Sequence, residues 1–132
     1  MTPEPFGRLH VLAVDDEPFS QQILRRMLEH VGIGRITLAS DGQAALTALA
    51  EADPPIDLII TDIEMPGLDG FEMARQIRWD RVPGYKDVPI IMLTAQENEE
   101  EYAQKGQIHR IQAFVLKPPG VDMLRQTIST LF

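Results

Sequence analysis

Three aspartates in this sequence stand directly after apolar segments, where their carboxylates could bind a metal ion. Asp15 and Asp16 follow the segment His10–Val14, and Asp62 follows residues 57–61. Three carboxylates placed close together repel each other, and one tends to stay protonated unless a cation is present. Oxygen ligands without cysteine or paired histidine favour Mg²⁺, which uses one or two carboxylates and keeps several waters. We therefore predict a Mg²⁺ site here, with Mn²⁺ as the alternative ion.

Two further polar residues close apolar segments and suit an anion. Thr94 ends the segment 89–94, and Lys117 ends the segment 113–117. Lysine offers a positive charge with rotatable donors for a phosphate oxygen, and threonine offers a hydroxyl donor. With the aspartates, these side chains predict a site for a phosphoryl group. An aspartate could itself be the acceptor, since aspartyl phosphate formation is known carboxylate chemistry.

A sheet is needed to bring these residues together, and the pattern of the chain predicts one. Five short apolar segments recur, and three show little polar alternation, which is typical of strands buried on both faces of a parallel sheet. The stretches between them have helical periodicity or helix-favouring composition. The predicted strands are 10–14, 35–39, 57–61, 89–94 and 113–117, and the predicted helices are 18–31, 42–52, 70–79, 98–109 and 121–132.

This alternation predicts an α/β, doubly wound fold with right-handed crossovers. Ligands bind such folds beyond the carboxyl ends of the strands, and that is where the polar residues stand. Gly32 is expected to end the first helix. The helix at 98–109 has a thin apolar stripe, which indicates an element held loosely to the core.

The composition excludes several classes of protein. The 132 residues argue for one domain, and 12 basic against 20 acidic residues give a net charge of −8, which counts against nucleic-acid and anionic-membrane binding. The absence of cysteine excludes disulfides and thiolate metal sites and fits a reducing compartment. No apolar stretch approaches the ~20 residues of a membrane helix, and no secretion signal is visible. These features favour a cytoplasmic protein.

Four pieces of the sequence together resemble the receiver domain of two-component response regulators. They are VLAVDDEP (residues 11–18), LIITDIEMPGLDG (58–70), PIIMLTA (89–95) and FVLKP (114–118). The pattern D-x-x-M-P-x-x-D-G is the most specific of them. The resemblance extends over residues 9–132 and leaves 1–8 as an N-terminal tail. It implies a flavodoxin-like (βα)5 fold whose five-stranded parallel sheet has the order 2-1-3-4-5.

The resemblance also implies how the acidic residues act. Asp62 would be the phosphoacceptor. It would receive the phosphoryl group from the phosphohistidine of a sensor histidine kinase or a histidine phosphotransfer protein. Asp15 and Asp16 would hold Mg²⁺, together with Asp62 and the backbone carbonyl of Glu64. Such a domain is a switch rather than an enzyme, although it assists its own Mg²⁺-dependent phosphorylation and dephosphorylation.

The remaining matched residues would contact the phosphate or move in response to it. Thr94 and Lys117 would contact it, the bond from Lys117 to Pro118 would be cis, and Phe114 would turn inward as Thr94 moves. A downstream protein would then bind the surface formed by the helix at 98–109, the strand at 113–117 and the helix at 121–132. In one departure from the family, Arg110 stands near a usual glycine, so the preceding helix is expected to be longer or differently capped.

Several alternatives stay open at this stage. Asp15 and Asp16 could cap the helix that begins at Pro18, and Phe114 could be an ordinary core residue. An FMN-binding flavodoxin would need a Ser/Thr-rich phosphate loop after the first strand. A haloacid-dehalogenase-type phosphatase would need D-x-D there. A pseudo-receiver would usually lack one residue of the set.

The sequence therefore favours a phosphorylation-activated switch of a two-component phosphorelay that signals through protein–protein contacts. The alternative is a receiver module excised from a larger hybrid kinase or multidomain regulator.

Overall fold

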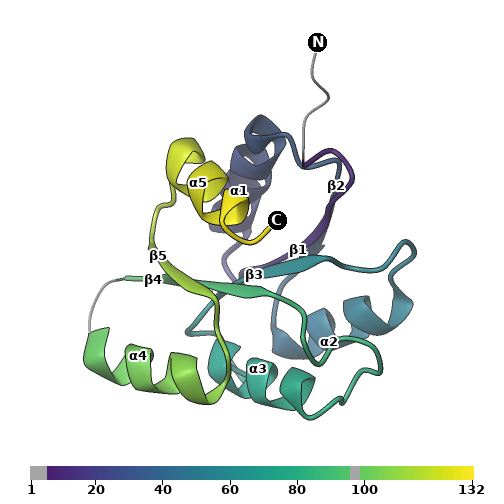
Figure 1. Ribbon diagram of the computed structural model, residues 1–132, viewed down its shortest axis with the longest axis vertical. Coiled ribbons are helices and arrows are strands. Elements are labelled where there is room, and N and C mark those ends of the chain that lie inside the picture. Colours follow the sequence, from purple (N-terminus) through teal and green to yellow (C-terminus); the bar gives the residue numbers. More distant parts are fainter. Residues whose placement is uncertain (1–5, 96–98) are drawn as a thin grey trace.

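The computed structural model describes residues 6–95 and 99–132, and within them five strands alternate with five helices (Figure 1). The elements are β1 His10–Val14, α1 Pro18–Val31, β2 Arg35–Ala39, α2 Gly42–Glu51, β3 Leu58–Asp62, α3 Gly70–Arg78, β4 Ile90–Thr94, α4 Glu99–Ile108, β5 Ala113–Leu116 and α5 Val121–Ser129. The strands pair in parallel in the order β2-β1-β3-β4-β5. The predicted doubly wound α/β fold and its strand order are confirmed.

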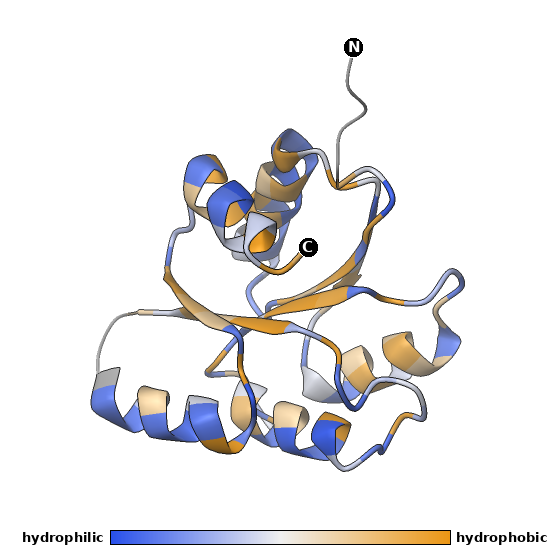
Figure 2. Cartoon of the chain, in the orientation of Figure 1, coloured by the Kyte–Doolittle hydropathy of each residue, from blue (hydrophilic) through white to orange (hydrophobic). Residues whose placement is uncertain are grey.

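The sheet is a middle layer with helices on both faces. Helices α1 and α5 cover one face, and α2, α3 and α4 cover the other (Figure 1). Alternate residues of a strand point to opposite faces, so β1 contributes Val11 and Ala13 to the apolar cluster under α1 and α5. Leu12 and Val14 belong to the cluster on the other face. The central strands β1, β3 and β4 are therefore made mostly of apolar residues (Figure 2), and the polar residues predicted for the site stand at the strand ends.

Helix α1 begins and ends at identifiable signals. The Glu17 carboxylate accepts hydrogen bonds from the backbone N–H groups of Phe19 and Ser20, at 3.1 and 2.7 Å. The alternative in which Asp15 or Asp16 caps this helix is therefore wrong, because the third acid of the run does so. Gly32 follows the helix in the left-handed conformation, with φ of 103°, as expected for a helix end.

Some element bounds differ from the predicted ones. Strand β3 continues to Asp62, which pairs with Leu93 of β4, and begins at Leu58 rather than at residue 57. Strand β5 ends at Leu116, although the Lys117 N–H still donates to the Thr94 carbonyl at 2.9 Å. The expected start of the fourth helix at residue 98 lies outside the described residues.

The end of α4 differs in a way that the unusual Arg110 accounts for. The helix ends at Ile108 and is not longer than expected. Arg110 itself adopts the left-handed conformation, with φ of 55°, which is uncommon for residues other than glycine. Its guanidinium bonds Asp87 at 3.1 Å and the Lys86 carbonyl at 3.1 Å, which anchors the turn into β5.

Candidate functional site

The site lies at the carboxyl edge of the sheet, where the central strands β1, β3 and β4 end. Asp15 follows β1, and its N–H donates to the Ala39 carbonyl of β2 at 3.1 Å. Asp62 is the last residue of β3. Because parallel strands end at the same edge, Asp15 and Asp62, which are 62 − 15 = 47 positions apart in sequence, become neighbours. Three predicted site residues, Asp15, Asp62 and Lys117, meet here.

The carboxylates of Asp15, Asp16 and Asp62 form a cluster. One oxygen from each lies within 4.8 Å of the others. Asp15 is buried, Asp62 is half-buried and Asp16 is exposed. A set of oxygen ligands without thiolate or imidazole fits a hard cation such as Mg²⁺, which needs only one or two carboxylates and completes its shell with other oxygens.

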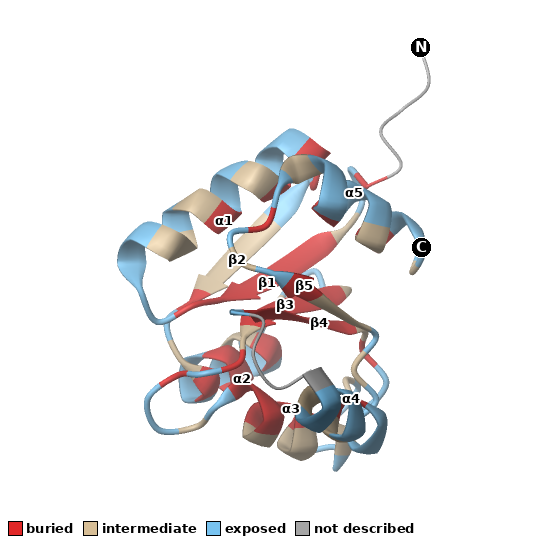
Figure 3. Ribbon diagram, turned by 90° about the vertical axis from the view of Figure 1, so that its left-hand side faces the viewer, coloured by how far each residue is buried: buried red, intermediate tan, exposed pale blue. Residues whose placement is uncertain are grey.

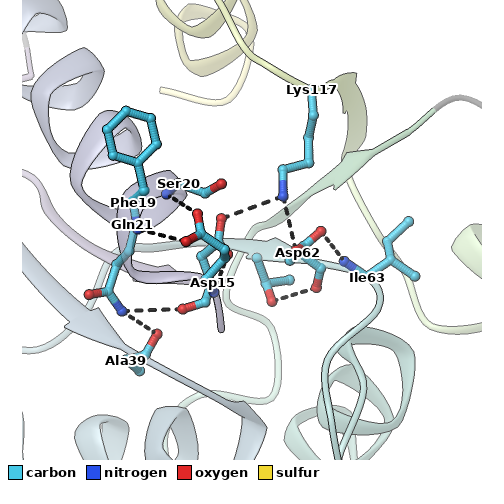
Figure 4. Close-up of polar contacts among 10 residues, drawn as sticks. Asp15, Phe19, Ser20, Gln21, Ala39, Asp62, Ile63 and Lys117 are labelled. Carbon is cyan, nitrogen blue, oxygen red and sulfur yellow. Dashed lines mark hydrogen bonds and ion pairs between the residues drawn. The ribbon is translucent and has the colours of Figure 1, made fainter.

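Lys117 reaches into this cluster from the end of β5 and bridges two of the acids (Figure 4). Its Nζ lies 3.0 Å from Asp62 Oδ2 and 3.5 Å from Asp15 Oδ2. The other oxygens accept backbone hydrogen bonds, from Glu17 to Asp15 Oδ1 at 3.0 Å and from Ile63 to Asp62 Oδ1 at 3.1 Å. The lysine therefore offsets part of the negative charge, and the backbone fixes the orientation of both carboxylates.

The electrostatics of the pair reflect its burial. Burial raises the pKa of Asp62, and the charge of Asp15 adds to this, while the hydrogen bond from Lys117 opposes it. For Lys117, burial acts to lower the pKa, but the hydrogen bond and charge of Asp62, with the charge of Asp15, outweigh it and raise the pKa. Lys117 is thus held in its charged form, while the ionised Asp62 is destabilised without a further cation.

A cavity of about 250 Å³ opens beside Asp62 and Lys117. Thr94, at the end of β4, lines it and is largely buried. Glu64 also lines it and is exposed to solvent. The cavity therefore brings a carboxylate, an ammonium group and a hydroxyl to one space, which suits a single tetrahedral anion.

Tyr102 of α4 also lines this cavity, and the sequence did not identify it as a site residue. It belongs to the thin apolar stripe of the helix, so an aromatic residue in a helix poor in apolar side chains was the available signal. Its position at the site depends on how the helix is rotated on the sheet.

Phe114, the predicted switch residue, belongs to β5, and its half-buried side chain packs against α4. Its ring is nearly parallel to that of Tyr102, with centroids 6.2 Å apart and an interplanar angle of 8°. It also contacts Phe71 of α3, at 6.2 Å between centroids. The Lys117–Pro118 peptide bond is cis. In this arrangement Phe114 packs against the core and adjoins the cavity lining through Tyr102.

The surface of α4, β5 and α5 carries several exposed apolar side chains. Ile108 lies on α4, Leu116 on β5 and Met123 on α5. Helix α4 is exposed over most of its length (Figure 3). Of residues 100–108, which the structure describes, only Gly106 is buried, and it carries no side chain. None of the described helices is long and apolar enough to cross a membrane.

Comparisons with known proteins agree with this geometry. The family model described as the response regulator receiver domain matches residues 11–129. The virulence sensor protein BvgS of Bordetella bronchiseptica is 37% identical over 129 residues, which are 96% of this chain but only 10% of that protein. The chemotaxis protein CheY-3 of Vibrio cholerae is 28% identical over 94% of this chain and 92% of its own length. The solved structure of Vibrio cholerae CheY4 has a TM-score of 0.82 and 31% identity over 94% of this chain and 98% of its own.

Proposed function

Because the chain belongs to the response regulator receiver domain family, we propose that Asp62 accepts a phosphoryl group from a partner phosphohistidine. Receiver domains are phosphoacceptor switches of two-component signalling, and the partner would be a sensor histidine kinase or a histidine phosphotransfer protein. The observation that carries the proposal is the Lys117 ammonium between Asp62 and Asp15, at 3.0 and 3.5 Å. This arrangement orients one acceptor carboxylate at the mouth of a cavity that fits one phosphoryl group.

The bonds that form and break in the transfer lie between the Asp62 carboxylate and the phosphohistidine. An oxygen of the Asp62 carboxylate forms a bond to phosphorus, and the P–N bond to the imidazole breaks. The electron pair of that bond stays on the imidazole nitrogen, which takes up a proton. Lys117 and the Thr94 hydroxyl donate to the phosphoryl oxygens and stabilise the charge that develops on them. The product is an aspartyl phosphate and a neutral histidine.

The carboxylate cluster supports a Mg²⁺ site. Asp15, Asp16 and Asp62 would hold the ion, with the backbone carbonyl of Glu64 as a further ligand. When bound, Mg²⁺ supplies positive charge that offsets the charge of the transferring phosphoryl group. Lys117 alone cannot neutralise three carboxylates, which is the reason for expecting an additional cation.

The signal would arise from a population shift. An aspartyl phosphate brings about −1.5 to −2 charge and three acceptor oxygens. Thr94 and Lys117 can donate to these oxygens in one arrangement only, so that arrangement gains free energy on phosphorylation. Movement of Thr94 would release space for Phe114, and α4 is the weakly attached helix above it.

We assign the exposed face of α4, β5 and α5 as the surface for a downstream protein. Its support is the set of exposed apolar side chains Ile108, Leu116 and Met123 on three adjacent elements. Substituting Met123 of α5 with Asp tests this surface at an exposed position that does not line the cavity. It should abolish binding of the downstream protein while leaving phosphorylation of Asp62 at its usual rate.

The decisive experiment is phosphorylation with a small phosphodonor, such as acetyl phosphate, in the presence of Mg²⁺. Intact-mass measurement should show a gain of one phosphoryl group. The gain should be absent in Asp62→Asn and retained in Asp122→Asn, a matched control at a fully exposed aspartate. A gain that survives Asp62→Asn, or no gain in the wild type, would rule out Asp62 as the acceptor.

A second part of the phosphorylation experiment tests the assignment of the Mg²⁺ ligands. Asp16→Ala should lose labelling because the exposed ligand is removed, and chelation of Mg²⁺ should do the same to the wild type. If Asp16→Ala is labelled as fast as the wild type and still responds to Mg²⁺, the assignment of Asp16 is wrong.

A further inference from the structure

Tyr102 occupies a position that the roles assigned to Thr94 and Phe114 do not explain. It projects from α4 to the cavity that Asp62, Thr94 and Lys117 also line. The other tyrosine, Tyr85, is far from this edge and accepts a hydrogen bond from the Ile56 N–H at 3.1 Å. Tyr102 is thus the one aromatic side chain among the residues lining the described cavity.

The ring of Tyr102 is held in place by other aromatic rings. It stacks on Phe114 and lies 5.7 Å from Phe71 of α3, measured between centroids. The three rings join α3, α4 and β5. Because the described side chains of α4 are otherwise mostly exposed, this aromatic contact is a main attachment of the helix to the core. A change in the position of Tyr102 therefore requires a change in Phe114 or in α4.

Gly106 shows how closely α4 approaches Phe114. A Cβ atom added at Gly106 would lie 2.8 Å from Phe114 Cε2 and 3.1 Å from Cζ. Glycine is less favourable than alanine inside a helix. Its presence in the middle of α4 is explained by the ring beneath it, since any larger side chain would displace the ring or lift the helix.

We propose that Tyr102 is a positioning residue of the phosphoryl site: in those phosphorylated molecules in which Phe114 has not turned inward, the Tyr102 ring, stacked on Phe114 beneath Gly106, limits access of water to phosphorylated Asp62. The inference rests on the proposed function. Hydrolysis requires a water oxygen to bond to phosphorus as the bond from phosphorus to the Asp62 oxygen breaks. The products are inorganic phosphate, which carries the protons of the water, and the free carboxylate. A ring in the cavity leaves less room for that water.

The test compares the lifetime of the phosphoryl group among variants of the whole chain. Each protein is phosphorylated with acetyl phosphate and Mg²⁺, and the donor is then removed. Intact-mass measurement follows the loss of the phosphoryl group with time. Tyr102→Ala should shorten the lifetime about threefold to tenfold, the effect of a modest change in barrier. Tyr102→Phe, which keeps the ring, should restore the wild-type lifetime. Gln104→Ala, at an exposed position of the same helix, should not change it.

A second arm tests the stack itself. Gly106→Ala should shorten the lifetime as Tyr102→Ala does, because its methyl group forces Phe114 away from Tyr102. In a Phe114→Leu background the methyl group meets no ring, so Gly106→Ala should add little. If Gly106→Ala and Phe114→Leu change the lifetime by factors that simply multiply in the double variant, the two sites are independent. That result would overturn the role of the stack.

The outcomes separate the two proposals. If the wild type gains no phosphoryl group, the proposed function fails and this inference fails with it. If the wild type is labelled on Asp62 but Tyr102→Ala decays at its rate, only the inference about Tyr102 is wrong. Circular dichroism checks folding, and Tyr102→Leu, which keeps apolar bulk without the ring, replaces Tyr102→Ala if the latter does not fold.

Discussion

Lys117→Met isolates the electrostatic part of the site, because methionine keeps an apolar stem and removes only the ammonium. In the wild type that ammonium lies 3.0 Å from Asp62 and 3.5 Å from Asp15. The Asp15 side chain is 1% exposed and that of Asp62 is 14% exposed, so water cannot replace the lost partner easily. The variant therefore keeps two neighbouring acids without their counter-charge.

The magnitude follows from the burial of the three groups. Removing one partner of a fully buried ion pair costs about 3–5 kcal/mol, because the other charge stays uncompensated. The Lys117 side chain is 28% exposed, so solvent already screens part of its interaction. We therefore expect Lys117→Met to lose about 2–3 kcal/mol of unfolding free energy in the presence of a chelator. The control Lys86→Met, at an exposed lysine, should stay within about 0.5 kcal/mol of the wild type.

Mg²⁺ should reverse part of this loss. A ligand that binds only the folded state stabilises it by an amount that grows with its affinity. Lys117 occupies the same carboxylates that would hold the ion, so the variant should bind Mg²⁺ more tightly and gain more stability from it. Urea unfolding followed by circular dichroism, with chelator and with Mg²⁺, measures both quantities. Equal stability in chelator, or an equal Mg²⁺ increment in the two proteins, would refute the reasoning.

Two further predictions concern stability. Arg78 is half-buried and donates to four backbone carbonyls in the segments before β4 and β5, at 2.7 to 3.0 Å. Arg78→Met should therefore lower the unfolding free energy by about 2–4 kcal/mol in urea titrations, whereas Arg81→Met at an exposed arginine should have little effect. Burial raises the folded-state pKa of Asp62 above 3.8, so without metal the wild type should lose stability as pH rises from that value through the folded pKa. Asp62→Asn should lack that decline and be the more stable protein at neutral pH, and identical pH profiles of urea midpoints would contradict this.

The sequence predicts the architecture well because its signals are local. The apolar runs of β1 and β2 and the turn signals Pro18 and Gly32 define those elements, and the structure has the predicted bounds for β1, α1 and β2. The meeting of Asp15, Asp16 and Asp62 is also predictable, since parallel strands end at one edge of the sheet. Neither inference requires knowledge of side-chain direction.

Features that depend on side-chain direction are not predictable in this way. Each of three successive acids could cap α1. In the structure Asp15 points toward Lys117, Asp16 belongs to the carboxylate cluster, and Glu17 takes the capping position. Tyr102 reaches the cavity because of how α4 is rotated and how closely Gly106 lets it approach β5. Such contacts join segments through space, and no periodicity in the chain records them.

The charge of the site explains why phosphorylation should move its residues. Asp15, Asp16 and Asp62 with Lys117 sum to −3 + 1 = −2, and a divalent cation would bring this to zero. Phosphorylation replaces the single charge of Asp62 by about −2, so the site gains about one negative charge. In the structure, before phosphorylation, the ammonium of Lys117 forms ion pairs with both Asp62 and the buried Asp15. Because the added charge lies on oxygens farther from the backbone than the original carboxylate, we expect Lys117 to follow it. The Thr94 hydroxyl is a further donor that lines the cavity.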